Sequence, residues 1–419
     1  MDPETRRRMG EQAVALARAC DYHTTGTCEF LMDINKDFYF LEMNTRLQVE
    51  HPITEEITGV DLVEQQILTA AGHPLTLKQS DIRINGHATE YRVYAEDPSR
   101  KFLPSIGFLT KYLEPKPHQD MRIDTGVQEG SEISMYYDPM ISKLITWGKD
   151  RETSMRLLGE KLDEYVVHGV DHNIGFGKSI IENEAYWKGN YSTAFIPTYY
   201  KDGYHGEELT NHRKHSIALA AFKMRNISTS QNVLASGLAS PESLLYVSIA
   251  GAEKNHDFKV EHQGNGKFEV TDLETGETQT HSLDKFDYQH NSLIELREGD
   301  SKTMLQLVSQ KNNLNFNFYL RGNKVKTTVY DATQYKYKPF MKVPEKIDTA
   351  KMVMSPMPGT VVSITVSVGD TVVDGQDLCV IEAMKMQNLI KSQRDGKIKS
   401  LNVKPGDSVA VDQLIIEFE

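Results

Sequence analysis

Cysteine and tryptophan are scarce in this sequence of 419 residues, which has three cysteines and two tryptophans. Cys20, Cys28 and Cys379 are odd in number, far apart and without the close spacing of metal ligands. This excludes a disulfide-stapled scaffold and indicates a reducing compartment. The sequence also lacks an apolar run long enough to cross a bilayer, so we expect no membrane as a partner.

Positive charge is in deficit. The sequence has 47 Lys and Arg against 59 Asp and Glu, and the net charge of -12 argues against a nucleic-acid partner.

A targeting peptide is also lacking at the start of the sequence. Asp2, Pro3 and Glu4 are typical of an N-cap, a first helical turn and an acid at the positive end of a helix dipole. We therefore expect a helix to about Cys20 with no presequence, in a chain long enough for two to four domains.

An internal repeat occupies the C-terminal segment. Gly359–Ile364 leads to Gly369–Val372 in one copy, and Gly396–Leu401 leads to Gly406–Val409 in the other, with the same spacing between the glycines. Each copy alternates apolar and polar residues, which predicts two interlocked sheets with quasi-two-fold symmetry. Lys385 falls between the copies, so we expect it in an exposed hairpin turn.

The residues around that lysine, Glu382–Met386, resemble the attachment motif of the biotinyl domain of biotin-dependent carboxylases. A lone Met-Lys-Met would read as a solvated turn, but the repeat on both sides favours attachment, and the flanking methionines favour biotin over a lipoyl group. The resemblance covers Met352–Glu419. It implies a flattened β-barrel in which a biotin protein ligase attaches biotin covalently to Lys385.

Near the N-terminus, two β-rich runs predict a hairpin, Cys28–Asp33 and Phe38–Met43. If the turn centres on Asn35 and Lys36, Glu29 lies opposite Glu42 on one face. Like charges in that relation repel, so either a Mg²⁺ neutralises them or both splay into water.

Polar residues then alternate along the chain at even positions, which an extended strand places on one face. They are Glu42, Asn44, Arg46, Gln48 and Glu50. Such a face suits either a half-buried strand that meets water or the floor of an active site. If this face is the floor of an active site, Glu42 and Asn44 suit a metal ion. Arg46 then suits a small anion, and Glu50 suits the role of general base.

The run Glu42–Pro52 resembles the catalytic strand and loop of biotin carboxylase, an ATP-grasp enzyme. The resemblance implies an ATP- and bicarbonate-dependent ligase, with Mg²⁺ or Mn²⁺ as the ion. It implies that Glu29, Glu42 and Asn44 hold the metal, that Arg46, Gln48 and the Val49 backbone bind bicarbonate, and that Glu50 takes the bicarbonate proton.

Three further runs extend this resemblance over Met1–Asp202. Gly86–Arg92 matches the strand whose arginine stabilises the biotin enolate, which implies that role for Arg92. Phe102–Gly107 matches the same enzyme, and Tyr136–Leu144 is interpreted as support for the site. The family's N-terminal nucleotide half and glycine-rich lid are absent from this sequence, so we expect only the metal and bicarbonate half of the site here.

The middle of the chain predicts a helix over Asn211–Asn226 and a series of short strands, which suggest a small antiparallel barrel beside one helix. The expected organisation is α+β and multidomain: partial biotin carboxylase 1–202, barrel 203–336, mobile linker 337–351 and biotinyl domain 352–419. The expected strands are Ser243–Ile249, Leu293–Arg297, Met304–Ser309, Leu314–Leu320 and Lys324–Tyr330.

This layout resembles the alpha subunits of biotin-dependent acyl-CoA carboxylases of the propionyl-CoA type, with methylcrotonyl-CoA or acetyl-CoA carboxylases as alternatives. It implies a hetero-oligomer with a carboxyltransferase beta subunit that binds the acyl-CoA, in the mitochondrial matrix or, in a bacterium, the cytoplasm. A second class stays open, in which the chain is a biotin carrier and assembly fragment that is inactive alone.

Overall fold

The structure is a computed structural model that describes residues 1–236, 242–251, 254–341, 351–383 and 386–419. The chain divides into two compact units. Unit 1 comprises residues 1–91, 117–124 and 143–158, and unit 2 comprises residues 92–116, 125–142 and 159–419. Each unit is described by itself below.

The elements of unit 1 surround a small hairpin. They are α1 (Pro3–Ala19), β1 (Thr27–Met32), β2 (Phe38–Asn44), α2 (His51–Thr58), α3 (Leu62–Ala70) and the 3-10 turn η1 (Gln79–Asp81). Four elements run through the unit boundaries: β3 (His87–Tyr94), β8 (Met121–Thr125), β10 (Met140–Gly148) and α4 (Arg151–Glu164). The strands among these form a sheet in the order β3-β10-β8.

The predicted N-terminal helix is confirmed as α1. Asp2 is its N-cap, and the Asp2 carboxylate accepts a hydrogen bond from the Thr5 backbone N–H at 2.9 Å. Pro3 occupies the first helical position, where its missing N–H costs nothing. Asp150 caps the start of α4 in the same way, with Thr153 N donating to Asp150 Oδ1 at 2.8 Å.

The β1–β2 hairpin pairs as predicted at its base but not at its tip. Glu29 lies opposite Glu42, whereas Phe30 lies opposite Phe40, so Leu41 is an extra residue in a β-bulge. The tip is therefore centred on Asn35 alone, half a position earlier than predicted, and the bulge restores the register of the two glutamates.

Short elements make up the N-terminal part of unit 2. The strands are β4 (Glu96–Asp97), β5 (Leu103–Pro104), β6 (Gly107–Phe108), β7 (Lys111–Leu113), β9 (Glu132–Ile133) and β11 (Val166–His168). The helices are η2 (Pro98–Arg100), α5 (Ile174–Glu182), α6 (Glu184–Trp187) and α7 (Phe195–Tyr199). The strands pair as β4-β5, β6-β9 and β7-β11.

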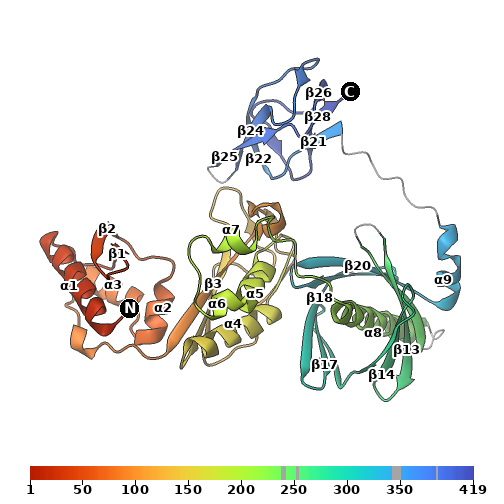
Figure 1. The fold of residues 1–419 in the computed structure, drawn as a ribbon, viewed down its shortest axis with the longest axis horizontal. Helices are drawn as coiled ribbons and strands as arrows, with labels where there is room; N and C mark the ends of the chain where they lie inside the picture. Colours follow the sequence, from red (N-terminus) through yellow and green to blue (C-terminus); the bar gives the residue numbers. More distant parts are fainter. Residues whose placement is uncertain (237–241, 252–253, 342–350, 384–385) are drawn as a thin grey trace. The chain divides into compact units, whose positions relative to one another are not determined.

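The expected barrel is a curled antiparallel sheet wrapped around α8 (Asn211–Ser236), as Figure 1 shows. Its order is β15-β14-β13-β12-β20-β19-β18-β17-β16, so the two edge strands are not paired with each other. The strands are β12 (Leu244–Ile249), β13 (His256–Gly264), β14 (Lys267–Asp272), β15 (Thr278–Ser282), β16 (Lys285–Gln289), β17 (Leu293–Glu298), β18 (Ser301–Lys311), β19 (Asn315–Leu320) and β20 (Asn323–Tyr330).

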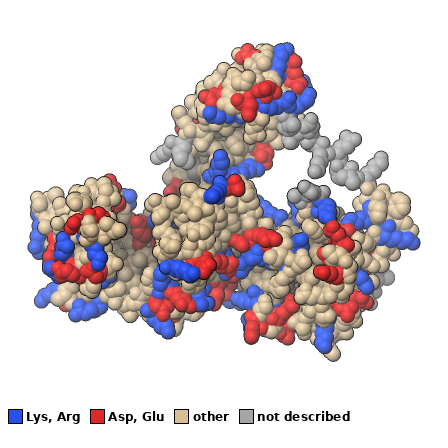
Figure 2. Space-filling view, viewed as in Figure 1, with Lys and Arg blue, Asp and Glu red and all other residues tan. Residues whose placement is uncertain are grey.

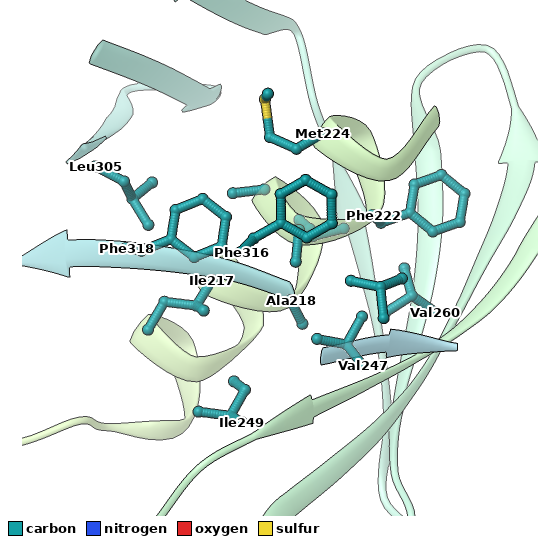
Figure 3. Packing of buried hydrophobic residues seen from close by; sticks show 14 of the residues in the cluster. Ile217, Ala218, Phe222, Met224, Val247, Ile249, Val260, Leu305, Phe316 and Phe318 are labelled. Atoms are coloured by element: carbon teal, nitrogen blue, oxygen red, sulfur yellow. The ribbon is translucent and has the colours of Figure 1, made fainter. Parts of the chain in front are cut away.

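The prediction of a helix beside a barrel is wrong in one respect, because α8 lies within the curl of the sheet. Six consecutive residues, Ile217–Phe222, are buried on every side of the helix. A helix with one apolar face could not show this pattern. Figure 3 shows Phe222 and Ile217 packed among Phe316, Phe318 and other side chains of the surrounding strands.

The start of the predicted linker is held to this sheet. It contains the end of α9 (Ala332–Tyr337) and the turn η3 (Lys338–Phe340). Lys338 Nζ lies 2.6 Å from Asp257 Oδ2 and donates to Ser248 Oγ at 3.1 Å. Residues 342–350 of the predicted linker lie outside the described residues.

The C-terminal domain consists of two four-stranded sheets, β21-β28-β26-β23 and β25-β24-β22-β27. The strands are β21 (Met352–Met354), β22 (Gly359–Ile364), β23 (Thr371–Val372), β24 (Asp377–Ala383), β25 (Met386–Lys391), β26 (Gly396–Leu401), β27 (Ser408–Val409) and β28 (Leu414–Phe418). Each copy of the repeat lends its short strand to the other copy's sheet, because β27 pairs with β22 and β23 pairs with β26.

The predicted quasi-two-fold symmetry is confirmed at the turns. Gly369 and Gly406 adopt φ values of 92° and 91°, a left-handed conformation that favours glycine. The following aspartates close equivalent turns. Asp370 Oδ2 accepts from Ser367 N at 2.7 Å, and Asp407 Oδ2 accepts from Lys404 N at 3.0 Å.

Acidic and basic side chains are interspersed over the described surface that Figure 2 shows. Among the described residues, no helix is both long enough and apolar enough to span a membrane.

Candidate active site

The two glutamates of the hairpin are brought together by an amide. Asn44 Nδ2 donates to Glu29 Oε1 at 2.8 Å and lies 3.3 Å from Glu42 Oε1. Two carboxylate oxygens therefore converge on one small donor, where a divalent cation would also gain both of them. Mg²⁺ is commonly held by one or two carboxylates together with substrate phosphates, so this donor set fits such an ion.

The fit is to a metal shared with a substrate, not to a fully enclosed ion. Within the described ranges, no cluster of three or more His, Cys, Asp or Glu side chains could hold a metal. At its base, the hairpin offers Glu29, Glu42 and the carbonyl oxygen of the Asn44 side chain. The remaining coordination positions would fall to phosphate oxygens or water.

The extended polar face predicted through Glu50 is wrong beyond Asn44. Strand β2 ends at Asn44, and Glu50 is the N-cap of α2 with φ -80° and ψ 8°. The chain turns between Gln48 and His51, whose backbone N–H donates to the Gln48 carbonyl at 3.3 Å. Pro52 at the start of α2 helps to explain the turn, because its ring fixes one helical φ angle.

Behind this turn lies a group of charged side chains that sequence reasoning did not single out. Glu55 on α2 is only 8% exposed and accepts hydrogen bonds from Arg122 Nη1 at 2.7 Å and Leu62 N at 2.8 Å. Arg122 also donates two hydrogen bonds to Asp124, from Nε to Oδ1 at 2.7 Å and from Nη2 to Oδ2 at 3.1 Å. The alternation of Arg122 and Asp124 in a short strand is the only signal in the sequence that could have pointed to them.

The interpretation of Tyr136–Leu144 as support for the site agrees with the position of Lys143. Its ammonium group is buried, lies 3.0 Å from Asp124 Oδ2 and contacts the Gln48–Glu50 turn. Although burial works against it, hydrogen bonds from Arg122 and Lys143 hold the pKa of Asp124 below its usual range. These hydrogen bonds therefore favour the ionised form of the Asp124 carboxyl group.

Arg92 belongs to unit 2, whereas the hairpin and its loop belong to unit 1, so the two groups are described separately. Asn173 fixes the backbone of β3 here: its Nδ2 donates to the Arg92 carbonyl at 3.0 Å, and its Oδ1 accepts from Tyr94 N at 2.9 Å. The Arg92 side chain hydrogen-bonds Tyr94. Arg92 thus sits on a strand with a well-held backbone.

Glu96 follows on β4 and is a titratable group that the sequence did not reveal. Burial, and secondarily the negative charge of Asp138, raise the pKa of Glu96 to about 7. An acid whose pKa is raised by folding stabilises the fold below its unfolded pKa and loses that contribution as pH rises through the folded pKa.

We therefore expect the Glu96→Gln variant to be more stable than the parent at pH 8 and similar at pH 4.5. After discounting for solvent screening, the gain in the free energy of unfolding at pH 8 is roughly 1 kcal/mol. Urea unfolding at both pH values measures it. A gain of equal size at both values would show that the pKa of Glu96 is not raised by folding.

Lys385 and Met384 lie outside the described residues. The flanking strands are described, and β24 pairs with β25 up to Ala383 opposite Met386. Glu382 lies opposite Gln387 in the same ladder. The predicted attachment position is therefore bracketed by two adjacent antiparallel strands of one sheet.

Three family models match parts of the chain. Residues 1–78 match "Carbamoyl-phosphate synthase L chain, ATP binding domain", and residues 90–198 match "Biotin carboxylase C-terminal domain". Residues 351–418 match "Biotin-requiring enzyme".

Curated relatives align along the whole chain. The mitochondrial propionyl-CoA carboxylase alpha chain of Homo sapiens is 43% identical over 431 residues, with 100% of this chain and 58% of the relative covered. That of Ruegeria pomeroyi is 39% identical over 449 residues and is covered to 64%. The mitochondrial methylcrotonoyl-CoA carboxylase subunit alpha of Dictyostelium discoideum is 36% identical over 425 residues, with 96% and 58% covered. The chain thus spans about three fifths of the length of these relatives.

Among solved structures, a biotin carboxylase complex from Campylobacter jejuni is 41% identical, with a TM-score of 0.45 and coverage of 48% of this chain and 44% of that one. A biotin carboxylase subunit of pyruvate carboxylase is 37% identical, with a TM-score of 0.47 and coverage of 48% and 45%.

Proposed function

This chain is a homologue of the alpha chains of propionyl-CoA carboxylase, and from that premise we propose that it is the biotin-bearing subunit of a biotin-dependent acyl-CoA carboxylase. The observation that carries the proposal is the combination, in one chain, of a biotin-requiring domain with a paired-glutamate hairpin that fits a magnesium–nucleotide complex. The proposed reaction uses ATP and bicarbonate to carboxylate biotin on Lys385.

In the first half-reaction, Glu29, Glu42 and Asn44 hold Mg²⁺ or Mn²⁺ at the hairpin. The ion supplies positive charge that offsets the phosphate oxygens of ATP. Arg46, Gln48 and the Val49 N–H bind bicarbonate, and Glu50 removes its proton. The bicarbonate oxygen then attacks the γ-phosphate of ATP to give carboxyphosphate and ADP. These residues act mainly by positioning and charge stabilisation.

In the second half-reaction, carboxyphosphate would break down to CO₂ and phosphate, and the phosphate would take the proton of the ureido N–H. Lys385 would hold the biotin, whose ureido nitrogen would accept the CO₂. Arg92, whose backbone carbonyl accepts a hydrogen bond from Asn173, would stabilise negative charge on the ureido oxygen. The carboxyl group is then delivered to propionyl-CoA on a beta subunit, giving methylmalonyl-CoA. We propose that the curled sheet, with α8 enclosed in it, binds that subunit.

The whole assembly is therefore proposed as a hetero-oligomer that depends on a biotin protein ligase. Its relatives from animals carry mitochondrial names, and the relative from Ruegeria pomeroyi is bacterial. We propose the mitochondrial matrix for a eukaryotic source and the cytoplasm for a bacterial one. The likeness to a methylcrotonoyl-CoA carboxylase subunit supports 3-methylcrotonyl-CoA as the second candidate substrate.

Fixation of labelled bicarbonate into acyl-CoA tests the proposal. The full-length protein is combined with the carboxyltransferase subunit of its source, ATP, Mg²⁺ and one acyl-CoA at a time. Propionyl-CoA is expected to be carboxylated at least about tenfold faster than 3-methylcrotonyl-CoA or acetyl-CoA at equal concentration. A reversed preference would reassign the substrate, and fixation into none of the three would contradict the proposed function.

A further inference from the structure

Two backbone carbonyls in the Gln48–Glu50 turn are each held by a side chain from elsewhere in unit 1. The Gln48 carbonyl accepts from His51 Nδ1 at 2.9 Å. A carbonyl oxygen can only accept, so His51 carries its hydrogen on Nδ1 in this contact. The Val49 carbonyl accepts from Lys143 Nζ at 3.0 Å.

The planarity of the peptide group gives these contacts a directional effect. The C=O of one residue and the N–H of the next lie in one plane and point in opposite directions. When His51 fixes the Gln48 carbonyl, it also aims the N–H of Val49. When Lys143 fixes the Val49 carbonyl, it aims the N–H of Glu50 and the direction in which Glu50 begins α2.

A chain of charged side chains lies behind both contacts, buried at Lys143 and Glu55 and half-buried at Arg122 and Asp124. Lys143 is 7% exposed and forms an ion pair with Asp124, and Asp124 forms a second ion pair with Arg122. Arg122 bonds Glu55, whose Oε2 lies 3.8 Å from His51 Nε2. Ion pairs thus connect Lys143 to Glu55, and each of these charges has a partner of opposite sign.

Burial of the Lys143 and Glu55 charges costs desolvation energy that their partners offset. A buried charge that loses its partner is strongly destabilising, so the ion pairs with Asp124 and Arg122 hold Lys143 and Glu55 in place. The surface turn at Gln48–Glu50 would otherwise be a flexible connection between β2 and α2.

We propose that His51 and Lys143 are positioning residues for bicarbonate. His51 aims the Val49 N–H at the bicarbonate oxygen, and Lys143 sets the place of the Glu50 carboxylate that takes the proton. The ion pairs among Glu55, Arg122 and Asp124 keep His51 and Lys143 in fixed positions relative to each other. This inference rests on the proposed function of the loop and adds two residues that touch neither bicarbonate nor ATP.

Two matched pairs of variants test it in the full-length protein. His51→Asn keeps a side-chain N–H near the position of Nδ1, whereas His51→Leu removes it. Lys143→Arg keeps a cation, whereas Lys143→Met removes it. Lys161→Met is the control, because Lys161 is also 7% exposed and donates to a backbone carbonyl, that of Lys116, at 2.9 Å, and to Glu164 at 3.1 Å, away from the loop.

The kinetic readout is the KM for bicarbonate compared with the KM for ATP. We expect His51→Leu and Lys143→Met to raise the KM for bicarbonate about tenfold or more and to change the KM for ATP less than about twofold. The conservative variants are expected to recover most of the loss. Lys161→Met is expected to lower the melting temperature and leave both KM values unchanged.

The second readout does not depend on activity. Hydrogen–deuterium exchange of residues 45–52 is expected to speed up about tenfold in His51→Leu and Lys143→Met, and to stay at the parent rate in Lys161→Met. Unchanged exchange in both variants would overturn the positioning inference. Faster exchange with unaltered bicarbonate kinetics would instead show that the loop does not bind bicarbonate, which contradicts the proposed function.

Discussion

The Lys385→Arg variant is expected to carry no biotin at all, whereas the parent is biotinylated when it is produced together with a biotin protein ligase. Attachment requires a neutral amine that attacks the activated carboxyl group of biotin and forms an amide. Arginine keeps the positive charge and much of the length of lysine, but its guanidinium stays protonated and is a poor nucleophile. The loss should therefore be complete without a change in fold.

Avidin blotting and the intact mass of the purified protein measure this result. Lys391→Arg is the matched control, because Lys391 is an exposed lysine at the far end of β25 in the same sheet. It should be biotinylated as fully as the parent. Biotin on the Lys385→Arg protein would place the attachment site at another lysine.

Glu50→Gln is expected to lower bicarbonate-dependent ATP hydrolysis by at least about 100-fold, because general-base catalysis commonly contributes factors of 10² to 10⁴. Glutamine keeps the size and the hydrogen-bonding oxygen but cannot take up the bicarbonate proton. The Glu50 side chain makes no capping hydrogen bond to α2, so the helix itself should be retained. Biotinylation of Lys385 should remain at the parent level.

The measurement compares ATP hydrolysis by the purified chain with and without bicarbonate, in the presence of free biotin. Activity in the parent that is lost in Glu50→Gln would support the base role. Equal activity in both proteins would remove Glu50 from the mechanism. A folded, biotinylated parent without activity would leave this chain as a carrier and assembly part of a longer or multi-chain enzyme.

The sequence predicted best where one local pattern decides the structure. Alternation of apolar residues located β12, β17, β19 and β20 almost to the residue, and Asp2 with Pro3 located the start of α1. It missed β13 to β16, which are rich in charged and polar residues because many of their side chains are exposed. It also ended α8 ten residues early, since polar residues dilute the apolar pattern after Asn226.

For the candidate site, the sequence predicted the facing of Glu29 and Glu42, and the register confirms it. It failed at Glu50, because a period of two cannot show that a strand stops at Asn44. The sequence could not predict the roles of Arg122 and Lys143 for a different reason. Arg122 and Lys143 lie some 70 to 90 residues beyond the loop in the chain, and only folding brings Lys143 to Val49.

The extra residue at Leu41 has a consequence for how this hairpin can diverge between species. Residues on the tip side of the bulge pair in their own register, so the tip can lengthen or shorten by whole residue pairs without disturbing Glu29 and Glu42. Loss of the single residue at Leu41 would shift the pairing by one and turn one glutamate to the opposite face. Alignments of homologues should therefore show length variation around Asn35 and none between Leu41 and Asn44.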